Sequence, residues 1–541
     1  MIYESTMSNR LTDAGVGRMS LWKTLQTVIT RVVENGKLRA GLLFLFVFHA
    51  VGIVFVASRQ GPGMSSDSVF YASAARAFAA TGELVTYSGA PLAAWPPGFP
   101  LTLGWAIRLG LDLESFATAL NLACVALVVL LTYQLAVVTL KSSGLALLSA
   151  LLVSAAASTV RVFSMLWTEP VFAVLVLVTL VVLAHAAGEM ETNWYWLLIV
   201  AVAVTVATLF RFAGFALIPV VALGVALAFR RRGWIRAVSI GFAAAVAASV
   251  GMLLVLYRNL LLGGSLLGTR APNPHSARQI LWASFADLSQ YLLPVKTAWA
   301  TEVGILIAVL LLFAVWRIVR ARNLGLLVVA AFVVIYWPFL WYSAFSAGID
   351  LPNQRLTSPI HGPMVVMAVF AIRELWARLP LAQPPVTVKH HAARALVFLG
   401  VSVLGASVIL SLMVGWKYAL SAAQRGIGHN SIASLESPLA RAIRDLPAVA
   451  GVAANDANQA YWATGRTPML QTPRIGYVYE ALGYESMEKF IDRTRDGSVT
   501  HLAFFDANIR GVSEPDELVA AGVKIELIAD YSDGSLWQVT N

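Results

Sequence analysis

Charged side chains and cysteines are both scarce in this chain. Only 13% of its 541 residues are Asp, Glu, Lys or Arg, whereas roughly 25% is usual for a globular domain. Hydrophobic residues make up 58% of the chain and the mean hydropathy is +0.73, so the composition excludes an ordinary soluble protein. The single cysteine, Cys124, excludes an intramolecular disulfide.

Several familiar sequence motifs are also missing. The chain contains no internal repeat, glycine-rich phosphate loop, HExxH or CxxC motif, or heptad series. Its net charge of +10 does not indicate a nucleic-acid partner, because such proteins collect basic residues on one continuous face. Here they form short blocks such as 229–236 (FRRRGWIR) and 316–323 (WRIVRARN), which are typical of cytoplasmic loops between membrane spans.

What the chain does contain is a series of apolar stretches close to the ~20 residues that cross a bilayer. They predict eleven spans, at about 41–58, 116–140, 145–166, 170–187, 194–210, 213–229, 237–257, 301–316, 324–343, 359–372 and 395–416. The basic blocks then lie on one side, which predicts a cytoplasmic segment 1–40 and an external C-terminus. Within 19–35, apolar residues at helical spacing predict a helix on the membrane surface.

Three long segments do not span and fall on the outer side: 59–115, 258–300 and the tail from about 417. In the tail, strand patterns begin at 451 and recur at 500–508 and 523–540, and amphipathic helices are predicted at 437–446 and 485–497. The tail is therefore predicted to be a small α/β domain. The whole chain is predicted to be a polytopic α-helical membrane protein with this domain outside.

Asp67 is one of the few carboxylates and follows the first span directly. The sequence after it predicts a helix with Ser66 or Asp67 as N-cap and Gly82 near its end. Capping and chemistry are both open as roles for Asp67. Tyr71 lies four residues on, on the same helical face, and an aromatic beside a carboxylate suits sugar binding. The three prolines in 92–110 predict a platform at membrane level rather than another span.

A second carboxylate, Glu169, precedes Pro170 at the predicted start of a span. It either caps that helix and complements the helix dipole or takes part in chemistry. The predicted topology puts it on the same face as Asp67. Arginines stand at the same ends of other spans and are candidate ligands of a phosphate, although lipid headgroups also explain each one: Arg211, Arg258, Arg270 and Arg355, with His275 and His361 nearby.

Together these motifs resemble the GT-C superfamily of membrane glycosyltransferases, in the branch that contains protein O-mannosyltransferases, the lipid A aminoarabinose transferase and Rgt-type enzymes. The resemblance covers most of 41–416 and depends on four segments: D67SVFY71 with W95PPGFP100, TEP at 168–170, RFAGFALIP at 211–219, and QRLTSPIHGP at 354–363. Two departures leave metal use and the donor open. Ser68 follows Asp67 where many relatives have Asp-Glu, and Glu169 replaces the commoner Asp.

The resemblance implies an inverting glycosyltransferase with a polyprenyl-phosphate-sugar donor in the bacterial inner membrane. Its acceptor would be an envelope glycan, glycolipid or protein on the outer face. Asp67 would be the general base, and Arg211, Arg355 and Arg270 would stabilise the leaving phosphate. Glu169 would orient the acceptor or an arginine, or hold a divalent cation if one is used. The implied domains are 1–40, a catalytic part at 41–416, and a periplasmic domain at 417–541.

Other functions remain open on the sequence alone. A transporter or flippase is the main alternative, although transporters usually carry paired repeats with ionisable residues near the bilayer midplane. An O-antigen ligase or polymerase also uses lipid-linked sugars. A non-catalytic scaffold predicts that replacing Asp67 has no effect.

Overall fold

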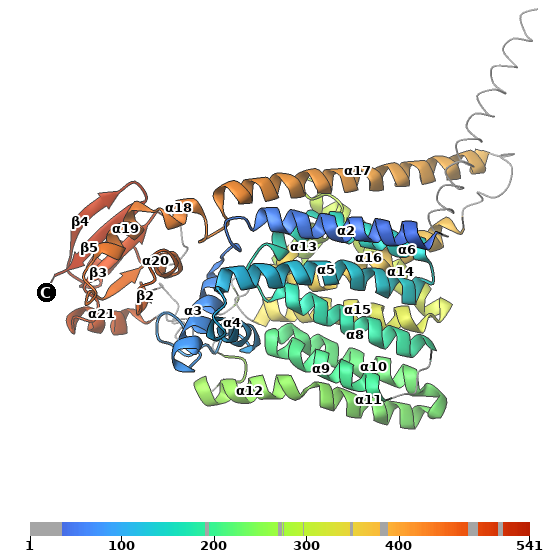
Figure 1. The fold of residues 1–541 in the computed structure, drawn as a ribbon, viewed down its shortest axis with the longest axis horizontal. Helices are drawn as coiled ribbons and strands as arrows, with labels where there is room; N and C mark the ends of the chain where they lie inside the picture. Colours follow the sequence, from blue (N-terminus) through green and yellow to red (C-terminus); the bar gives the residue numbers. More distant parts are fainter. Residues whose placement is uncertain are drawn as a thin grey trace, which may run out of the picture.

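The computed structural model describes residues 35–540, except for gaps at 190–193, 264, 269–272, 274, 296, 347–349, 379–387, 474–484 and 507–511. A bundle of long helices makes up most of the molecule, and a small sheet domain stands at one end of it (Figure 1). The predicted surface helix at 19–35 lies outside the described residues apart from Asn35. Asn35 caps the first described helix, α2.

Among the described residues, eight helices are long and apolar enough to cross a membrane singly. They are α2 (Gly36–Ala57), α5 (Leu113–Leu140), α8 (Glu169–Glu189), α10 (Leu217–Phe229) with its flanking 3-10 turns η1 (Phe212–Ala216) and η2 (Arg230–Arg232), α14 (Ala300–Ala321), α15 (Leu324–Ser346), α16 (Gln354–Trp376) and the Phe398–Arg425 part of α17 (Val388–Arg425).

Two bent helix pairs raise this number to ten if each pair is one span. They are α6 (Ser143–Ala155) with α7 (Ala157–Phe163), bent by 57°, and α11 (Trp234–Ala248) with α12 (Val250–Gly263), bent by 42°. The shorter helix α9 (Tyr195–Phe210) is apolar but has only 16 residues. Each predicted span coincides with one of these helices or pairs, while the total of eleven crossings stays a prediction.

The segment between the first two spans forms a platform of two short helices, α3 (Ser66–Thr81) and α4 (Gly98–Arg108). The predicted N-cap of α3 is wrong by one or two residues. Ser65 is the cap and forms a reciprocal capping box with Ser68, so the Asp67 side chain is free for other contacts. Gly82 ends α3 in the left-handed region with φ 86°. At Gly98 a Cβ would lie 2.6 Å from the Leu209 carbonyl oxygen, so the platform packs closely on α9.

The far end of the bundle carries the basic loops. Lys141 and Glu189 form an ion pair of 2.8 Å there. Arg230 and Arg373 donate to the last carbonyls of neighbouring helices, Ala187 and Leu140. These residues lie at the C-terminal ends of α5, α8, α10 and α16, whereas the platform and the sheet domain lie at the opposite end (Figure 1). The basic loops and the platform therefore lie at opposite ends of the bundle, and the side of the membrane that each end faces stays a prediction.

The sheet domain has five strands in the order β2-β1-β3-β5-β4. The strands β1 (Val452–Ala454), β2 (Met469–Gln471) and β3 (His501–Phe505) are parallel, and β4 (Ile525–Tyr531) and β5 (Gly534–Val539) form an antiparallel hairpin that joins through β5. In the parallel part, Ala453 lies opposite both Leu470 and Leu502, and all three are buried.

Helices surround this sheet: α18 (Ile432–Leu435), α19 (Pro438–Asp445), α20 (Ala457–Thr464), α21 (Met487–Arg495) and α22 (Pro515–Ala520). The predicted helices at 437–446 and 485–497 and the three predicted strand regions are present. The sequence prediction missed β2, α20 and α22, whose short segments show no clear alternating or amphipathic pattern. One further helix, α13 (Ala277–Ser289), packs on α14 and is not among the candidate spans.

Candidate active site at the platform end

A cavity of about 620 Å³ opens at the platform end of the bundle. Its wall combines one charged region with a long apolar region, and the elements that build it are α3, the loop before α4, α9 with η1, α12, α15 and α16. The polar residues on the wall include Asp67, Tyr71, Thr168, Arg211, Asp350 and Arg355, and the apolar ones include Trp95, Phe215, Met252, Leu256, Leu267 and Phe339.

Arg355 connects the two carboxylates that the sequence singles out. One of its terminal nitrogens lies 2.5 Å from Asp67 Oδ2, and its Nε lies 2.6 Å from Glu169 Oε1. Arg355 is the second residue of α16, Asp67 the second of α3, and Glu169 the first of α8. Three helix N-termini from distant parts of the sequence therefore meet at one guanidinium.

Arg211 contacts the same Glu169 oxygen as Arg355. Its Nη1 lies 2.6 Å from Glu169 Oε1 and donates to the Thr168 hydroxyl at 2.8 Å. The Glu169 side chain is completely buried, and two arginines compensate its charge. Arg211 Nε is buried and has no hydrogen-bond partner among the described residues. The site thus keeps one unused guanidinium donor next to a cluster of charges.

Trp167 is a site residue that the sequence interpretation missed. The Arg355 guanidinium stacks over its ring, 4.5 Å from the centroid. The indole N–H donates to the hydroxyl of Ser65, the N-cap of α3, at 2.8 Å. Trp167 therefore fixes Arg355 relative to α3 and Asp67. Its position directly before the TEP segment was the only available signal.

Tyr71 lies on the cavity wall beside Asp67, as the helical spacing predicts. Its side chain is only 2% exposed, and its ring makes edge contacts with Trp95 and Phe99 at centroid distances of 5.8 and 5.5 Å. Burial raises the pKa of Tyr71 above its ordinary value, and the Asp67 charge adds to this effect. The phenol therefore stays neutral. Trp95 is the more accessible aromatic ring of the two.

The remaining predicted arginines differ in position. Arg270 lies outside the described residues. Arg258 donates to the Leu92 carbonyl at 2.8 Å, so it ties α12 to the platform. His275 is not on the cavity wall, and its backbone N–H and C=O bond the Asn273 side chain.

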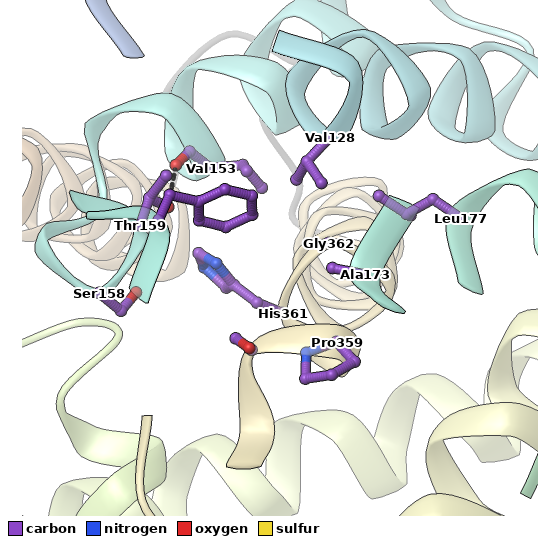
Figure 2. A pocket seen from close by; sticks show the side chains of 11 residues that line it. Val128, Val153, Ser158, Thr159, Ala173, Leu177, Pro359, His361 and Gly362 are labelled. Atoms are coloured by element: carbon purple, nitrogen blue, oxygen red, sulfur yellow. Dashed lines mark hydrogen bonds between the residues drawn. The ribbon is translucent and has the colours of Figure 1, made fainter. Parts of the chain in front are cut away.

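His361 is not part of the cavity. It stacks on Tyr291, with ring centroids 4.3 Å apart, inside the helix bundle. Figure 2 shows it in a separate small cavity between α6–α7, α8 and α16, near Val153, Ser158 and Leu177. That cavity has a volume of about 10 Å³, which is room for one water molecule at most. The structure brings Asp67, Tyr71, Glu169, Arg211 and Arg355 together but leaves His361 apart.

The linker to the sheet domain takes part in positioning the site. Gly63 forms a bridge with Met165, and Met64 forms a bridge with Gly428, so three segments run side by side as a short ladder. Asp67 follows the central segment by three residues, and Glu169 follows Met165 by four. The third segment belongs to the linker between α17 and the sheet domain.

Asn430 completes this junction. Its amide nitrogen donates to the carbonyls of Gln60 and Pro62 and to the Glu114 carboxylate, at 3.0 to 3.2 Å. Its amide oxygen accepts from the indole N–H of Trp462 in α20 at 3.2 Å. The sheet domain is thereby attached to the loop that leads into α3.

The charged cluster does not have the character of a metal site. Among the described residues, no group of three His, Cys, Asp or Glu side chains is arranged to hold a metal ion. The oxygens of Asp67 and Glu169 that face the cluster already accept from Arg355 and Arg211. Guanidinium groups lie where a cation between the carboxylates would have to bind.

No family model matches the sequence, and no curated protein matches it. Among solved structures, the fold is similar to ArnT from Cupriavidus metallidurans bound to undecaprenyl phosphate, with a TM-score of 0.60 and 15% identity over 92% of this chain and 98% of that one. The apo form of the same ArnT gives a TM-score of 0.60 at 16% identity, with the same coverage.

The fold is also similar to the archaeal oligosaccharyltransferase AglB from Archaeoglobus fulgidus, solved with an inhibitory peptide and a dolichol-phosphate. The TM-score is 0.51 and the identity 11%, over 86% of this chain and 69% of that one. At these identities the similarity concerns the fold. The chain therefore shares its overall fold with ArnT and AglB, and in this chain a small sheet domain lies at the C-terminal end.

Proposed function

We propose that this protein is an inverting glycosyltransferase that moves a sugar from a polyprenyl-phosphate-linked donor to an acceptor hydroxyl. The observation that carries the proposal is the 620 Å³ cavity with two arginines at one end and an apolar wall along the rest. A polyprenyl-phosphate donor has the same division into an anionic group and a long apolar chain. The ArnT and AglB structures, which bind undecaprenyl phosphate and dolichol-phosphate, support this assignment.

In the proposed reaction, Asp67 is the general base. The acceptor hydroxyl gives its proton to the Asp67 carboxylate while its oxygen attacks the anomeric carbon. The bond from that carbon to the phosphate oxygen breaks, and its electron pair leaves with the polyprenyl phosphate. One displacement without a covalent intermediate inverts the anomeric configuration.

Arg211 and Arg355 stabilise the second negative charge that develops on the leaving phosphate. Arg211 keeps its Nε free for this contact. Arg355 contacts Asp67 in the free protein, so a donor phosphate that attracts Arg355 also releases the base. Glu169 holds both guanidiniums in place and does not contact the reacting atoms.

The proposed location is the bacterial inner membrane with the sheet domain in the periplasm. The basic loops at the far end of the bundle support this orientation. The acceptor would then be an envelope glycan, a glycolipid or a protein, and the sugar a hexose or a pentose. We further propose that 41–416 is the catalytic part and 417–541 a separate domain that supports it.

The test is the glycan profile of a strain that lacks the gene. Wild type and Asp67→Asn are expressed at equal membrane levels, and envelope glycans and glycolipids are compared by mass spectrometry. Wild type is expected to restore one sugar-sized increment that the variant does not restore. Equal restoration by both proteins would exclude Asp67 as the base, and no increment with either would favour a transporter or a scaffold.

A further inference from the structure

Asp350 is the second carboxylate on the wall of the cavity besides Asp67, and it lies in the segment between α15 and α16. Unlike Asp67 and Glu169, it has no hydrogen bond or ion pair with the residues that the structure describes, and only longer-range charges act on it. It does not cap α16 either, because the Asn353 side chain accepts from the first N–H groups of that helix. Asp350 is exposed to solvent, so its charge needs no protein partner, and its carboxylate is available to a ligand in the cavity.

Asp350 adds to the negative charge around the cavity. Asp67, Glu169 and Asp350 face two arginines, Arg211 and Arg355, and a lipid phosphate brings a further negative charge. An unpaired carboxylate near an anion weakens phosphate binding, unless it makes a favourable contact with another part of the same ligand.

We propose that Asp350 binds the sugar of the donor by accepting hydrogen bonds from its hydroxyl groups, with the ring of Trp95 packing against the sugar. This inference rests on the proposed function and extends it to a sugar subsite. An ionised carboxylate accepts hydrogen bonds and donates none, so it attracts hydroxyls and repels phosphate. Arg211 and Arg355, which contact the other two carboxylates, attract phosphate instead.

The arrangement therefore orients the donor. The phosphate turns toward Arg211 and Arg355, and the sugar turns toward Asp350 and Trp95, which all line one cavity. Trp95 is suited to this contact because its ring is only partly covered. Phe70 and Tyr71 support it, with ring centroids at 5.0 and 5.8 Å. A rigid aromatic face and a carboxylate on the wall of one cavity offer partners to the apolar and the polar sides of a sugar.

The experiment compares two kinds of probe on the purified full-length protein in lipid nanodiscs. One is undecaprenyl phosphate, and the other is undecaprenyl phosphate that carries mannose, glucose, galactose or arabinose. Dissociation constants are measured for wild type, Asp350→Asn and Trp95→Ala. The matched control is Asp445→Asn, which removes an exposed carboxylate from the sheet domain.

Wild type is expected to bind at least one sugar-linked probe more tightly than undecaprenyl phosphate. Asp350→Asn should weaken that probe about tenfold, as expected for loss of a hydrogen bond to a charged group, and leave undecaprenyl phosphate within twofold. Equal weakening of both probes, no change in either, or a wild type that prefers no sugar-linked probe would each overturn the sugar subsite. A wild type that does not bind undecaprenyl phosphate contradicts the proposed function itself.

Discussion

Asp67 and Glu169 are two carboxylates that share one arginine but occupy different surroundings. The Asp67 side chain is 28% exposed and lies on the cavity wall, whereas that of Glu169 is completely buried and contacts two arginines. Both follow segments of the short ladder formed by Gly63, Met165 and their neighbours, so the same backbone bridges position both residues. Because only Asp67 is accessible from the cavity, it is suited to react with a substrate, whereas the buried Glu169 is suited to organise the guanidiniums.

The largest effect is expected from Asp67→Asn. If Asp67 is the base, the amide removes the proton acceptor and lowers kcat about a thousandfold, while its size and its position on α3 are kept. Binding of undecaprenyl phosphate and the unfolding temperature should remain near wild type. The measurement is sugar transfer by the purified protein under saturating donor. If binding of undecaprenyl phosphate falls by the same factor as kcat, Asp67 helps to hold the lipid phosphate, as Glu169 does, and is not the base.

Glu169→Gln should affect folding as well as function. Removing the buried charge leaves two guanidiniums without their carboxylate, and breaking a buried ion pair costs about 3 kcal/mol. We expect a lower unfolding temperature and weaker binding of undecaprenyl phosphate together. Arg355 retains Asp67 as a partner and Arg211 retains Thr168, so the protein should still fold. An unchanged unfolding temperature with lost turnover would mean that Glu169 is the reacting group.

Asn430→Ala tests whether the linker positions Asp67 without affecting Glu169. Asn430 is 4% exposed and bonds the loop before Asp67 but not the segment before Glu169. Its loss leaves the Trp462 indole and the Glu114 carboxylate short of a partner, at a cost of roughly 2 kcal/mol. We expect kcat to fall more than lipid-phosphate affinity.

The matched control for Asn430→Ala is Glu436→Ala, which removes an exposed side chain directly after α18 in the same linker region. It should leave kcat and stability unchanged. If Asn430→Ala lowers the unfolding temperature and leaves kcat at the wild-type value, the linker supports the fold and has no part in placing Asp67.

Asp287 shows what happens to a buried carboxyl without an arginine. It is 1% exposed and accepts one bond, from the Thr357 hydroxyl, and burial raises its pKa to about 7. The folded protein therefore holds this proton up to about pH 7, whereas the unfolded chain releases it near its ordinary pKa of 3.8. Stability from this group is present below that lower value and is lost as the pH rises toward 7.

The test is thermal unfolding of wild type and Asp287→Asn at pH 5 to 8. The neutral amide does not lose its proton, so the stability of the variant relative to wild type should rise by about 2 kcal/mol between pH 5 and 7. Asp445→Asn serves as the exposed control and should follow wild type. Parallel curves for Asp287→Asn and wild type would contradict the assignment of a buried neutral carboxyl.

The smallest effect is expected from Arg211→Lys. A lysine keeps the charge near Glu169 but loses the planar group with its free Nε. We expect about tenfold weaker binding of undecaprenyl phosphate, with the fold intact. Binding at wild-type strength would show that the unused donor of Arg211 does not contact the phosphate.

Much of this fold was predictable because a bilayer imposes a simple rule on sequence. Apolar stretches of sufficient length coincide with helices throughout the bundle, and basic loops distinguish one end of it from the other. The alternating and helical patterns of the tail predicted its main strands and helices. The prediction failed for the cap of α3, because Ser65, Ser66 and Asp67 are all good N-caps and only the backbone geometry distinguishes them.

The sequence by itself determined the number and type of the candidate residues: two carboxylates and several arginines at the ends of apolar helices. Only the tertiary structure decided which of them meet. Arg355 reaches Asp67 across 288 positions of the chain and Glu169 across 186, whereas His361, only six residues further along α16, points into the helix bundle. Spacing along one helix fixes which face a side chain occupies, but the packing of separate helices decides what that face contacts.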